Sequence, residues 1–268
     1  MMEKVIGYYE GYDEGNRLGR DRVRQLEFAT TTHVLEPYLQ SVENLLDIGA
    51  GTGAYAFYYA ARGVRVTAAD VTPGHVDAMR KRIAKERISG MTAELADATD
   101  LSRYADESFD TVLCLGPLYH LRTAENRQNC LKECMRVLKP GGVLATAYIN
   151  RFFIAEYLIA SGAKKPEAPW LSRVAEQGTF GADERDPFLS AAYFHTPGEA
   201  ETELRFAGFD VREHVAVEGN GFVISDAVGK MSEEQYRIWT EHHFLVCREP
   251  SRLGSSNHGL IVARKTLA

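Results

Sequence analysis

The chain has 268 residues, of which 45% are hydrophobic, so it can bury the core of one large domain or of one domain with sizeable insertions. Its net charge is −6, from 31 basic and 37 acidic residues, with no long run of one sign, which argues against an extended polyphosphate partner. No stretch is apolar and long enough for a signal peptide or a membrane-spanning helix, so we expect a cytoplasmic protein with no membrane insertion.

Residues 1–40 come first, and their apolar spacing is typical of one or two helices, so we expect a helical cap there. From residue 44 to about 149, short apolar runs alternate with amphipathic stretches, which predicts the repeated strand and helix units of an α/β fold. In chain order the expected elements are a strand at 44–48, a helix at 52–62, a strand at 64–69, a helix at 73–88, a strand at 91–96, a strand at 111–115, a helix at 124–138 and a strand at 143–149.

Beyond this core the pattern is interrupted twice. Residues 150–197 mix aromatic residues with a loop rich in glycine, proline and charge, which indicates an insertion. A second insertion is expected at 218–257. The remaining expected elements are a helix at 198–207, a strand at 210–217, a helix at 232–246 inside the second insertion, and a last strand at 259–265.

A glycine-rich turn joins the first strand to the first helix of this core, with the sequence LLDIGAGTG over residues 45–53. Glycines permit positive φ angles and let a ligand lie against bare backbone, so the turn is expected to bind a cofactor. Asp70 closes the second strand, where a carboxylate can accept hydrogen bonds from both ribose hydroxyls of an adenosine group.

The glycine turn alone does not decide which nucleotide binds. Gly49, Gly51 and Ala54 also satisfy the looser dinucleotide pattern, so an NAD-dependent oxidoreductase is one alternative. Asp47 favours S-adenosylmethionine, because a carboxylate before the first glycine suits a cationic sulfonium and ammonium but not a pyrophosphate. A non-catalytic module that only binds the cofactor is a further alternative.

Four motifs in the same region resemble the class I methyltransferases of type 11, a family that includes ubiquinone and menaquinone methyltransferases. After the glycine loop, ELADA at 94–98 is similar to the third-strand motif, and SFDTV at 108–112 with LYHL at 118–121 to the fourth. ECMRVLKPGG at 133–142 resembles the stretch before the fifth strand. The resemblance implies a Rossmann-like domain over residues 41–268, with a seven-stranded, mostly parallel sheet, helices on both faces, an antiparallel last strand, the N-terminal helical cap and the two insertions.

The family pattern implies a role for the residues of the first two strand ends. Gly49 and Gly51 would pack against the methionine part of S-adenosylmethionine, and Asp47 would orient its amino group. Asp70 would hold the ribose while Val71 lies against the adenine.

The same resemblance extends to the third and fourth strand ends. Asp97 would accept from the adenine amino group with Ala98 nearby, although Asp97 could instead cap the next turn. The backbone around Leu115 would face the methionine amino group. Tyr12, followed by Asp13, is similar to a Tyr-Asp pair in the family's N-terminal helix, which commonly closes over the cofactor.

Methyl transfer needs few catalytic groups, because the donor is already reactive and the protein mainly aligns the acceptor and excludes water. His120 follows the fourth strand and is the first candidate for a general base, with a packing role as the alternative. His195 is the second candidate. The residues expected to bind the substrate, all near the same edge of the sheet, are Tyr119, Tyr148, Arg151 and Tyr193. Arg151 could instead pair with a nearby carboxylate.

The sequence predicts a small-molecule acceptor without naming it. Adenine and glutamine N-methyltransferases resemble one another in an Asn or Asp before Pro-Pro and an aromatic residue after the fourth strand, whereas this chain has LGPLY at 115–119. With an acidic balance as well, nucleic acid is not expected as a partner. The four cysteines lack zinc-site spacing, and the adjacent His242 and His243 point apart on a helix, so no metal is expected.

Overall fold

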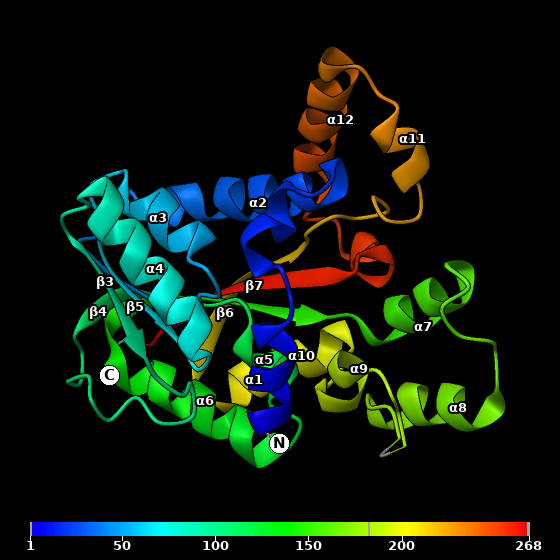
Figure 1. The fold of residues 1–268 in the computed structure, drawn as a ribbon, viewed down its shortest axis with the longest axis horizontal. Coiled ribbons are helices and arrows are strands. Elements are labelled where there is room, and N and C mark those ends of the chain that lie inside the picture. The colour runs from blue at the N-terminus through cyan, green and yellow to red at the C-terminus, as the bar shows by residue number, and fades with distance from the viewer. Residues whose placement is uncertain (1, 182, 267–268) are drawn as a thin grey trace.

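The computed structural model of the chain describes residues 2–181 and 183–266. A seven-stranded sheet with the order β3-β2-β1-β4-β5-β7-β6 forms its centre (Figure 1). In this order, each neighbouring pair of strands from β3 through β2, β1 and β4 to β5 is parallel. Strand β7 is antiparallel to both of its neighbours, β5 and β6. The strands are β1 (Asn44–Ile48), β2 (Arg65–Asp70), β3 (Met91–Leu95), β4 (Phe109–Cys114), β5 (Leu138–Ile149), β6 (Phe209–Ala216) and β7 (His258–Lys265).

The predicted Rossmann-like sheet with its antiparallel last strand is therefore confirmed, and the largest difference from the predicted strand boundaries is at the start of β5. We expected residues 139–142 to end a helix before a strand starting at Val143. The strand instead starts at Leu138, which pairs with Phe109. The register then shifts before Thr111 pairs with Val143, so the glycine-rich residues form an irregularity inside β5 rather than a loop before it.

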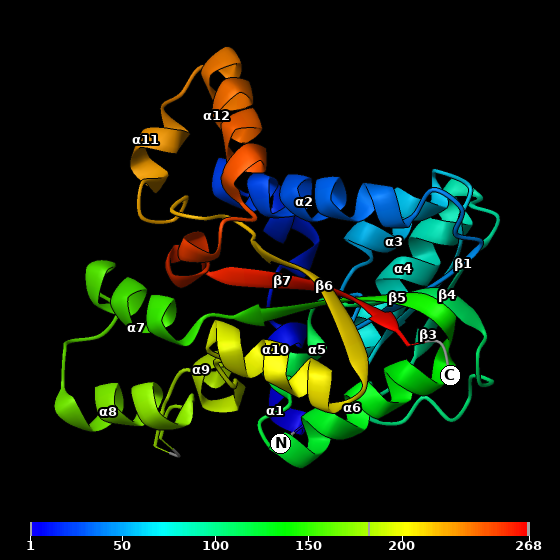
Figure 2. The same ribbon diagram turned by 180° about the vertical axis from the view of Figure 1, so that it is seen from behind.

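Helices cover both faces of the sheet (Figures 1 and 2). Successive strand residues point to opposite faces, so Leu45 packs into the core on one face and Leu46 into the core on the other. The helices on the Leu45 face are α2 (Arg22–Leu35), α3 (Ala54–Ala60) and α4 (Pro73–Glu86). Those on the Leu46 face are α5 (Pro117–His120), α6 (Ala124–Val137) and α10 (Pro197–Phe206).

The N-terminal segment is helical, as predicted, and places aromatic residues near the tips of the strands. Asp21 caps α2, because its side chain accepts a hydrogen bond from the Arg24 backbone N–H. The other elements of this segment are α1 (Met2–Glu10) and the short 3-10 helices η1 (Glu14–Gly19) and η2 (Glu36–Tyr38).

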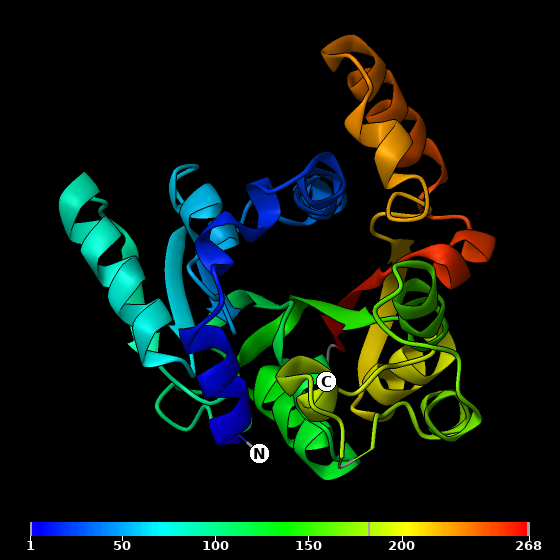
Figure 3. The same cartoon turned by 45° about the vertical axis from the view of Figure 1, so that its right-hand side comes forward.

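Both insertions are also helical. The first contains α7 (Arg151–Ala160), α8 (Ala168–Gln177) and α9 (Pro187–Ala191), and the second contains α11 (Ser225–Gly229), α12 (Glu233–Val246) and the 3-10 helix η3 (Pro250–Ser255). Figure 3 shows α11 and α12 projecting away from the sheet. Ser232 and Gln235 form a reciprocal capping box that starts α12. The Tyr236 hydroxyl ties this arm to α2, because it donates to the Arg22 carbonyl over 2.8 Å.

Across residues 2–181 and 183–266, none of the helices combines the length and the apolar character that crossing a bilayer requires.

Candidate functional site

A cavity of about 280 Å³ lies where the parallel strands end. Its walls come from the carboxyl ends of β1, β2, β3 and β4, from the N-terminal helices and from both insertions. In an open α/β sheet this edge is the usual place for a ligand. All the residues predicted to bind the cofactor line this one cavity, namely Asp47, Gly49, Gly51, Asp70, Val71, Asp97, Ala98 and Leu115.

Backbone N–H groups of the glycine turn donate hydrogen bonds to the end of β2. Gly49 and Gly51 have φ angles of +72° and +57°, in the left-handed region that glycine adopts at little cost. At Gly49 a side chain would also collide with the ring of Pro117, since a Cβ would lie 2.7 Å from its Cδ. Asp70 accepts hydrogen bonds from the backbone N–H groups of Gly51 and Thr72, both over 2.8 Å. The carboxylate therefore joins the glycine turn to the start of α4 at the floor of the cavity.

Asp47 is the most unusual acid of the cavity. Its side chain is buried, and Oδ2 has no hydrogen-bond partner among the described residues. Burial, together with the nearby Asp70 carboxylate, raises the pKa of Asp47 from 3.8 to about 7, against a backbone hydrogen bond from Ala56. An unpaired buried carboxylate is costly unless a cation or donor binds it, so this position fits a cationic ligand group.

The sequence left two alternatives for Asp97, a cap for the next turn and a position against the cofactor. Its Oδ1 accepts hydrogen bonds from the backbone N–H and the hydroxyl of Thr99, both over 2.8 Å, so it does cap the following turn. The residue nevertheless lines the cavity together with Ala96 and Ala98. Capping the turn therefore holds Asp97 at the wall, where a ligand can reach it.

His120 lines the cavity, and the N-terminal helix covers it. Its Nε2 lies 2.8 Å from the hydroxyl of Tyr9, and its Nδ1 has no partner in the described part of the chain. Burial lowers the pKa of His120 from 6.5 to about 4, so the ring is neutral at physiological pH. Neither Tyr9 nor Tyr12 was among the predicted site residues, but both line the cavity, and Tyr12 belongs to the Tyr-Asp pair that resembles the family pattern.

Tyr148 and His195 lie outside the cavity, which differs from the prediction. Ile149 lines the cavity, and alternation along β5 turns Tyr148 to the opposite face of the sheet. There the Tyr148 hydroxyl lies 2.8 Å from Nε2 of His214. His195 is fully buried, with its Nε2 3.3 Å from a Glu203 carboxylate oxygen. Neither residue is placed to contact a ligand at the strand tips.

Arg151 and Tyr193 also face away from the cavity. The buried guanidinium of Arg151 donates to the Phe194 carbonyl over 3.0 Å and pairs with Glu199 over 2.5 Å. Its Nη2 also lies 3.2 Å from the Tyr193 hydroxyl. Of the four residues predicted to bind the substrate, Tyr119 lines the cavity and the other three do not, and the Arg151–Glu199 pair agrees with the alternative given for Arg151. Their positions in the sequence correctly predicted that these residues lie near the carboxyl edge of the parallel strands, but not the direction in which their side chains point.

We expect Arg151→Ala to lower the free energy of unfolding by about 3 kcal/mol, because the change leaves buried carbonyls without a donor. Cofactor affinity should stay unchanged, since Arg151 does not line the cavity. Denaturant unfolding and calorimetry with S-adenosylhomocysteine measure the two effects. Lys81→Ala, at an exposed position of α4, is the matched control. A large loss of cofactor affinity in a folded Arg151 variant would restore the predicted binding role.

A cluster of charged side chains that the sequence analysis missed forms another part of the wall. Arg17 donates to Glu14 and to both carboxylate oxygens of Glu27, each over 2.8 Å. Next to it, Nδ1 of His258 lies 2.5 Å from an oxygen of Glu218. These residues come from η1, α2, the segment after β6 and the start of β7. No local motif links them, because only the folded chain brings them together.

The insertions supply an apolar wall on the same cavity. Phe153, Ile154 and Tyr157 come from α7, Phe188 from α9 and Phe222 from the arm that carries α11 and α12. Aromatic side chains at the open end of such a cavity favour an acceptor with a flat or apolar surface.

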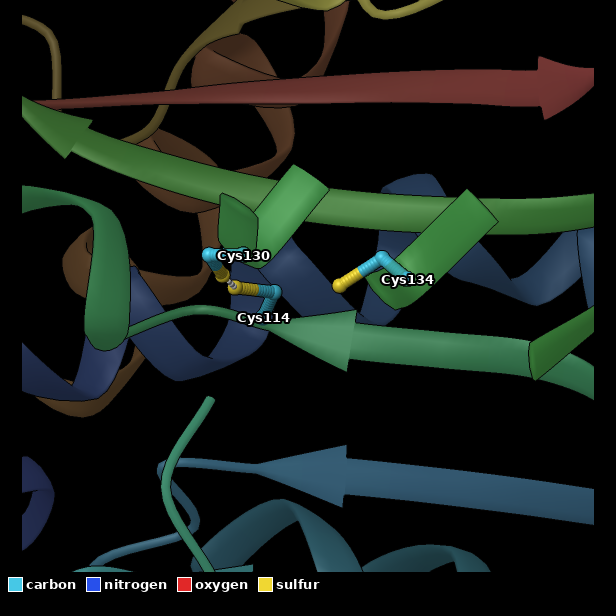
Figure 4. Close-up of side chains that lie close together, drawn as sticks. All are labelled: Cys114, Cys130 and Cys134. Atoms are coloured by element: carbon cyan, nitrogen blue, oxygen red, sulfur yellow. Dashed lines mark hydrogen bonds between the residues drawn. The ribbon is translucent and has the colours of Figure 1, made fainter. Parts of the chain in front are cut away.

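Two groups of side chains in the described residues have the spacing of metal ligands. In the first, Cys130 and Cys134 on α6 face Cys114 at the end of β4, as Figure 4 shows, and Cys114 and Cys130 have their sulfur atoms 3.7 Å apart. All three are fully buried in the hydrophobic core, where free cysteines pack as small apolar side chains. The second group is Glu27, Glu218 and His258, where the Arg17 guanidinium already supplies a cation to Glu27.

Comparisons with known proteins identify the central part of the chain. The family described as "Methyltransferase domain" matches residues 46–146. The demethylmenaquinone methyltransferase of Clavibacter sepedonicus is 38% identical over 143 residues, which cover 53% of this chain and 54% of that protein. The ubiquinone/menaquinone biosynthesis C-methyltransferase UbiE of Zymomonas mobilis is 34% identical over 157 residues, covering 59% and 58% of the two chains. The chain thus spans about half the length of the curated relatives that it matches.

Solved structures agree on the fold. A SAM-dependent methyltransferase from Methanosarcina mazei superposes with a TM-score of 0.58 at 21% identity, covering 88% of this chain and 98% of that one. The geranyl diphosphate C-methyltransferase of Streptomyces coelicolor, solved with S-adenosyl-L-homocysteine, gives 0.57 at 16% identity and covers 89% and 81%. The fold, the family match and the cavity residues lead to one conclusion. Residues 46–146 belong to the type 11 family of class I, S-adenosylmethionine-dependent methyltransferases, the family that the sequence motifs resemble.

Proposed function

We propose that the protein binds S-adenosylmethionine in this cavity and transfers its methyl group to a small-molecule acceptor. The observation that carries the proposal is Asp47, a buried carboxylate at the floor of the cavity with an unpartnered oxygen and a pKa raised to about 7 by burial. Such a group fits the ammonium of the methionine part, because a bound cation offsets the cost of the buried charge. A pyrophosphate in the same place would meet repulsion from Asp47.

The neighbouring residues fit the rest of the molecule. Asp70 accepts one backbone N–H at each oxygen, and its Oδ1 also lies 3.3 Å from Nδ1 of His75. Its Oδ2 can still accept a second hydrogen bond, from a ribose hydroxyl. Val71 would lie against the adenine. Asp97 and the Ala98 backbone would contact its amino group. Leu115 would border the methionine part, beside the left-handed turn of Gly49 and Gly51.

The bound donor supplies a methyl group on a sulfonium, which leaves readily. The chain therefore has to hold the acceptor in line with the methyl carbon and keep water out. Tyr9 and Tyr12 of the N-terminal segment line the cavity and serve to exclude water. His120, held by Tyr9, orients the acceptor through its free Nδ1 in this proposal.

Relatives that act on demethylmenaquinone and the aromatic wall of the cavity both support an apolar small-molecule acceptor, and neither supports nucleic acid. We place the reaction in the cytoplasm, where the four buried cysteines, which are free thiols, would stay reduced.

Isothermal titration of the purified protein with S-adenosylmethionine tests the proposal. We expect micromolar binding, and an affinity about 30-fold lower in Asp70→Asn, because hydrogen bonds to a charged acceptor are stronger than those to an amide. Asp77→Asn, at an exposed position of α4, is the control and should bind normally. Heat on addition of NADH but none with S-adenosylmethionine would instead support the oxidoreductase alternative.

A further inference from the structure

The start of β7 lies at the cofactor edge of the sheet for a topological reason. The other central strands end at this edge, but β7 is antiparallel to its neighbours and therefore begins there. Its first residue, His258, pairs with Ile149 at the end of β5. Both residues line the cavity, so the fold places an imidazole beside the strand tips.

Glu218 holds this imidazole in one orientation. One carboxylate oxygen of Glu218 lies 2.5 Å from Nδ1 of His258, and the other accepts from the His258 backbone N–H over 2.9 Å. That second oxygen also accepts from the Ser256 hydroxyl over 3.1 Å. Glu218 is fully buried, so its charge is directed to these donors. Because Nδ1 is engaged by a carboxylate, the proton-accepting lone pair of the neutral ring is at Nε2, on the other edge.

Other charged groups also act on His258. Oε2 of Glu27 on α2 lies 3.9 Å from its Nδ1, and the guanidinium of Arg17 on η1 is bound to Glu27. The ring of Tyr119, which follows β4, lies 6.4 Å away. Burial disfavours a charged imidazole here, but the carboxylates of Glu218 and Glu27 outweigh burial and the Arg17 charge, so the pKa of His258 is raised. His120 differs, since burial lowers its pKa to about 4 and its Nε2 is already bound to Tyr9.

The wall supplied by the insertions limits which acceptor can reach this base. Phe153, Tyr157 and Phe222 lie together, with ring centroids 5.7 to 6.0 Å apart. Phe222 follows Glu218 on the same segment, so one insertion supplies both an apolar surface and the partner of His258. A ring-shaped acceptor can stack on these aromatic side chains while a polar substituent points to the imidazole.

We propose that His258, held by Glu218, is the general base for an acceptor hydroxyl carried on an apolar ring. This inference rests on the proposed methyl transfer. The hydroxyl proton passes to Nε2 of His258 while the oxygen forms a bond to the methyl carbon. The carbon–sulfur bond breaks, its electron pair stays on sulfur, and the products are a methyl ether, a neutral thioether and an imidazolium stabilised by Glu218.

4-Nitrophenol is a suitable probe, because its phenolate absorbs at longer wavelength than its neutral form. The probe is added to the complex with S-adenosylhomocysteine at a pH below the pKa of the free phenol. We expect the wild type to bind it and to show the phenolate band. In His258→Gln the band should fall at least tenfold, and in Glu218→Gln it should fall in part. His242→Gln, at an exposed position of α12, is the control.

Calorimetry with S-adenosylhomocysteine on every variant separates the two proposals. If the wild type binds none, the proposed function fails. If it binds normally but the probe does not bind, or the phenolate band is equal in His258→Gln, only the inference about the dyad is overturned. A band lost in His120→Gln and kept in His258→Gln would assign the proton transfer to His120 instead. Retained S-adenosylhomocysteine affinity in His258→Gln would show that a weaker band does not come from misfolding.

Discussion

Asp47→Asn is expected to weaken S-adenosylhomocysteine binding by about 100-fold at pH 8, because the variant loses the charge that would pair with the cofactor's ammonium. The wild type should bind about tenfold more tightly at pH 8 than at pH 6, since the cation binds the ionised form of a carboxyl whose pKa is about 7. In the variant this pH dependence should disappear. Calorimetry across this range, in buffers that differ in ionisation enthalpy, would also detect proton release on binding by the wild type alone.

The same substitution should stabilise the protein without its cofactor. Burial raises the pKa of Asp47 from 3.8 to about 7 in the folded chain, so its contribution to stability is present below pH 3.8 and is lost as the pH rises to about 7. The full pKa displacement corresponds to about 4 kcal/mol, which we reduce to about 2 kcal/mol because water reaches the cavity.

Denaturant unfolding at pH 8 should therefore show a more stable Asp47→Asn variant that binds the cofactor poorly. Asp226→Asn, at an exposed position of α11, should change neither quantity. A variant with unchanged stability and unchanged affinity would contradict both the burial and the proposed role of Asp47.

The residues proposed to hold the cofactor could be placed around one cavity from the sequence because they sit at strand ends. Strand patterns place Asp47 and Asp70 at the carboxyl ends of parallel neighbours, and such ends meet at one edge of a sheet. The motif residues after β3 and β4 reach the same edge for the same reason. Local hydrophobic periodicity and the order of strands and helices were enough to predict where these residues lie.

The other walls of the cavity, which lie next to the insertions, could not be predicted in this way. Tyr148 and Ile149 are adjacent, and choosing the one that faces the cavity requires knowledge of which face the insertions cover. Glu218 and His258 are forty residues apart and meet because an irregular arm returns to the start of β7. Contacts of this kind depend on the path of the insertion, which no short pattern in the sequence describes.

Gly259→Ala is expected to lower the free energy of unfolding by about 3 kcal/mol, because its Cβ would lie 2.2 Å from Cζ of Tyr148. Gly259 and Tyr148 are paired across β7 and β5, so the ring covers the strand where the glycine has no side chain. The ring has little room to move, since it is buried and its hydroxyl is bound to His214. Gly74→Ala in α4, with no atom within 4 Å, is the control and should be neutral or slightly stabilising.

The position of Gly259 links this packing to the proposed base. His258 directly precedes it, so a strand displaced by the new Cβ would also move the imidazole away from Glu218. We expect any folded Gly259→Ala protein to lose the 4-nitrophenolate band while still binding S-adenosylhomocysteine at the β1 to β4 edge. Adding Tyr148→Ala should recover part of the lost stability, because the second change removes the colliding ring. If Gly259→Ala alone unfolded like the wild type, the Tyr148 ring would have to be free to move, and the close packing at the start of β7 could not be what positions His258.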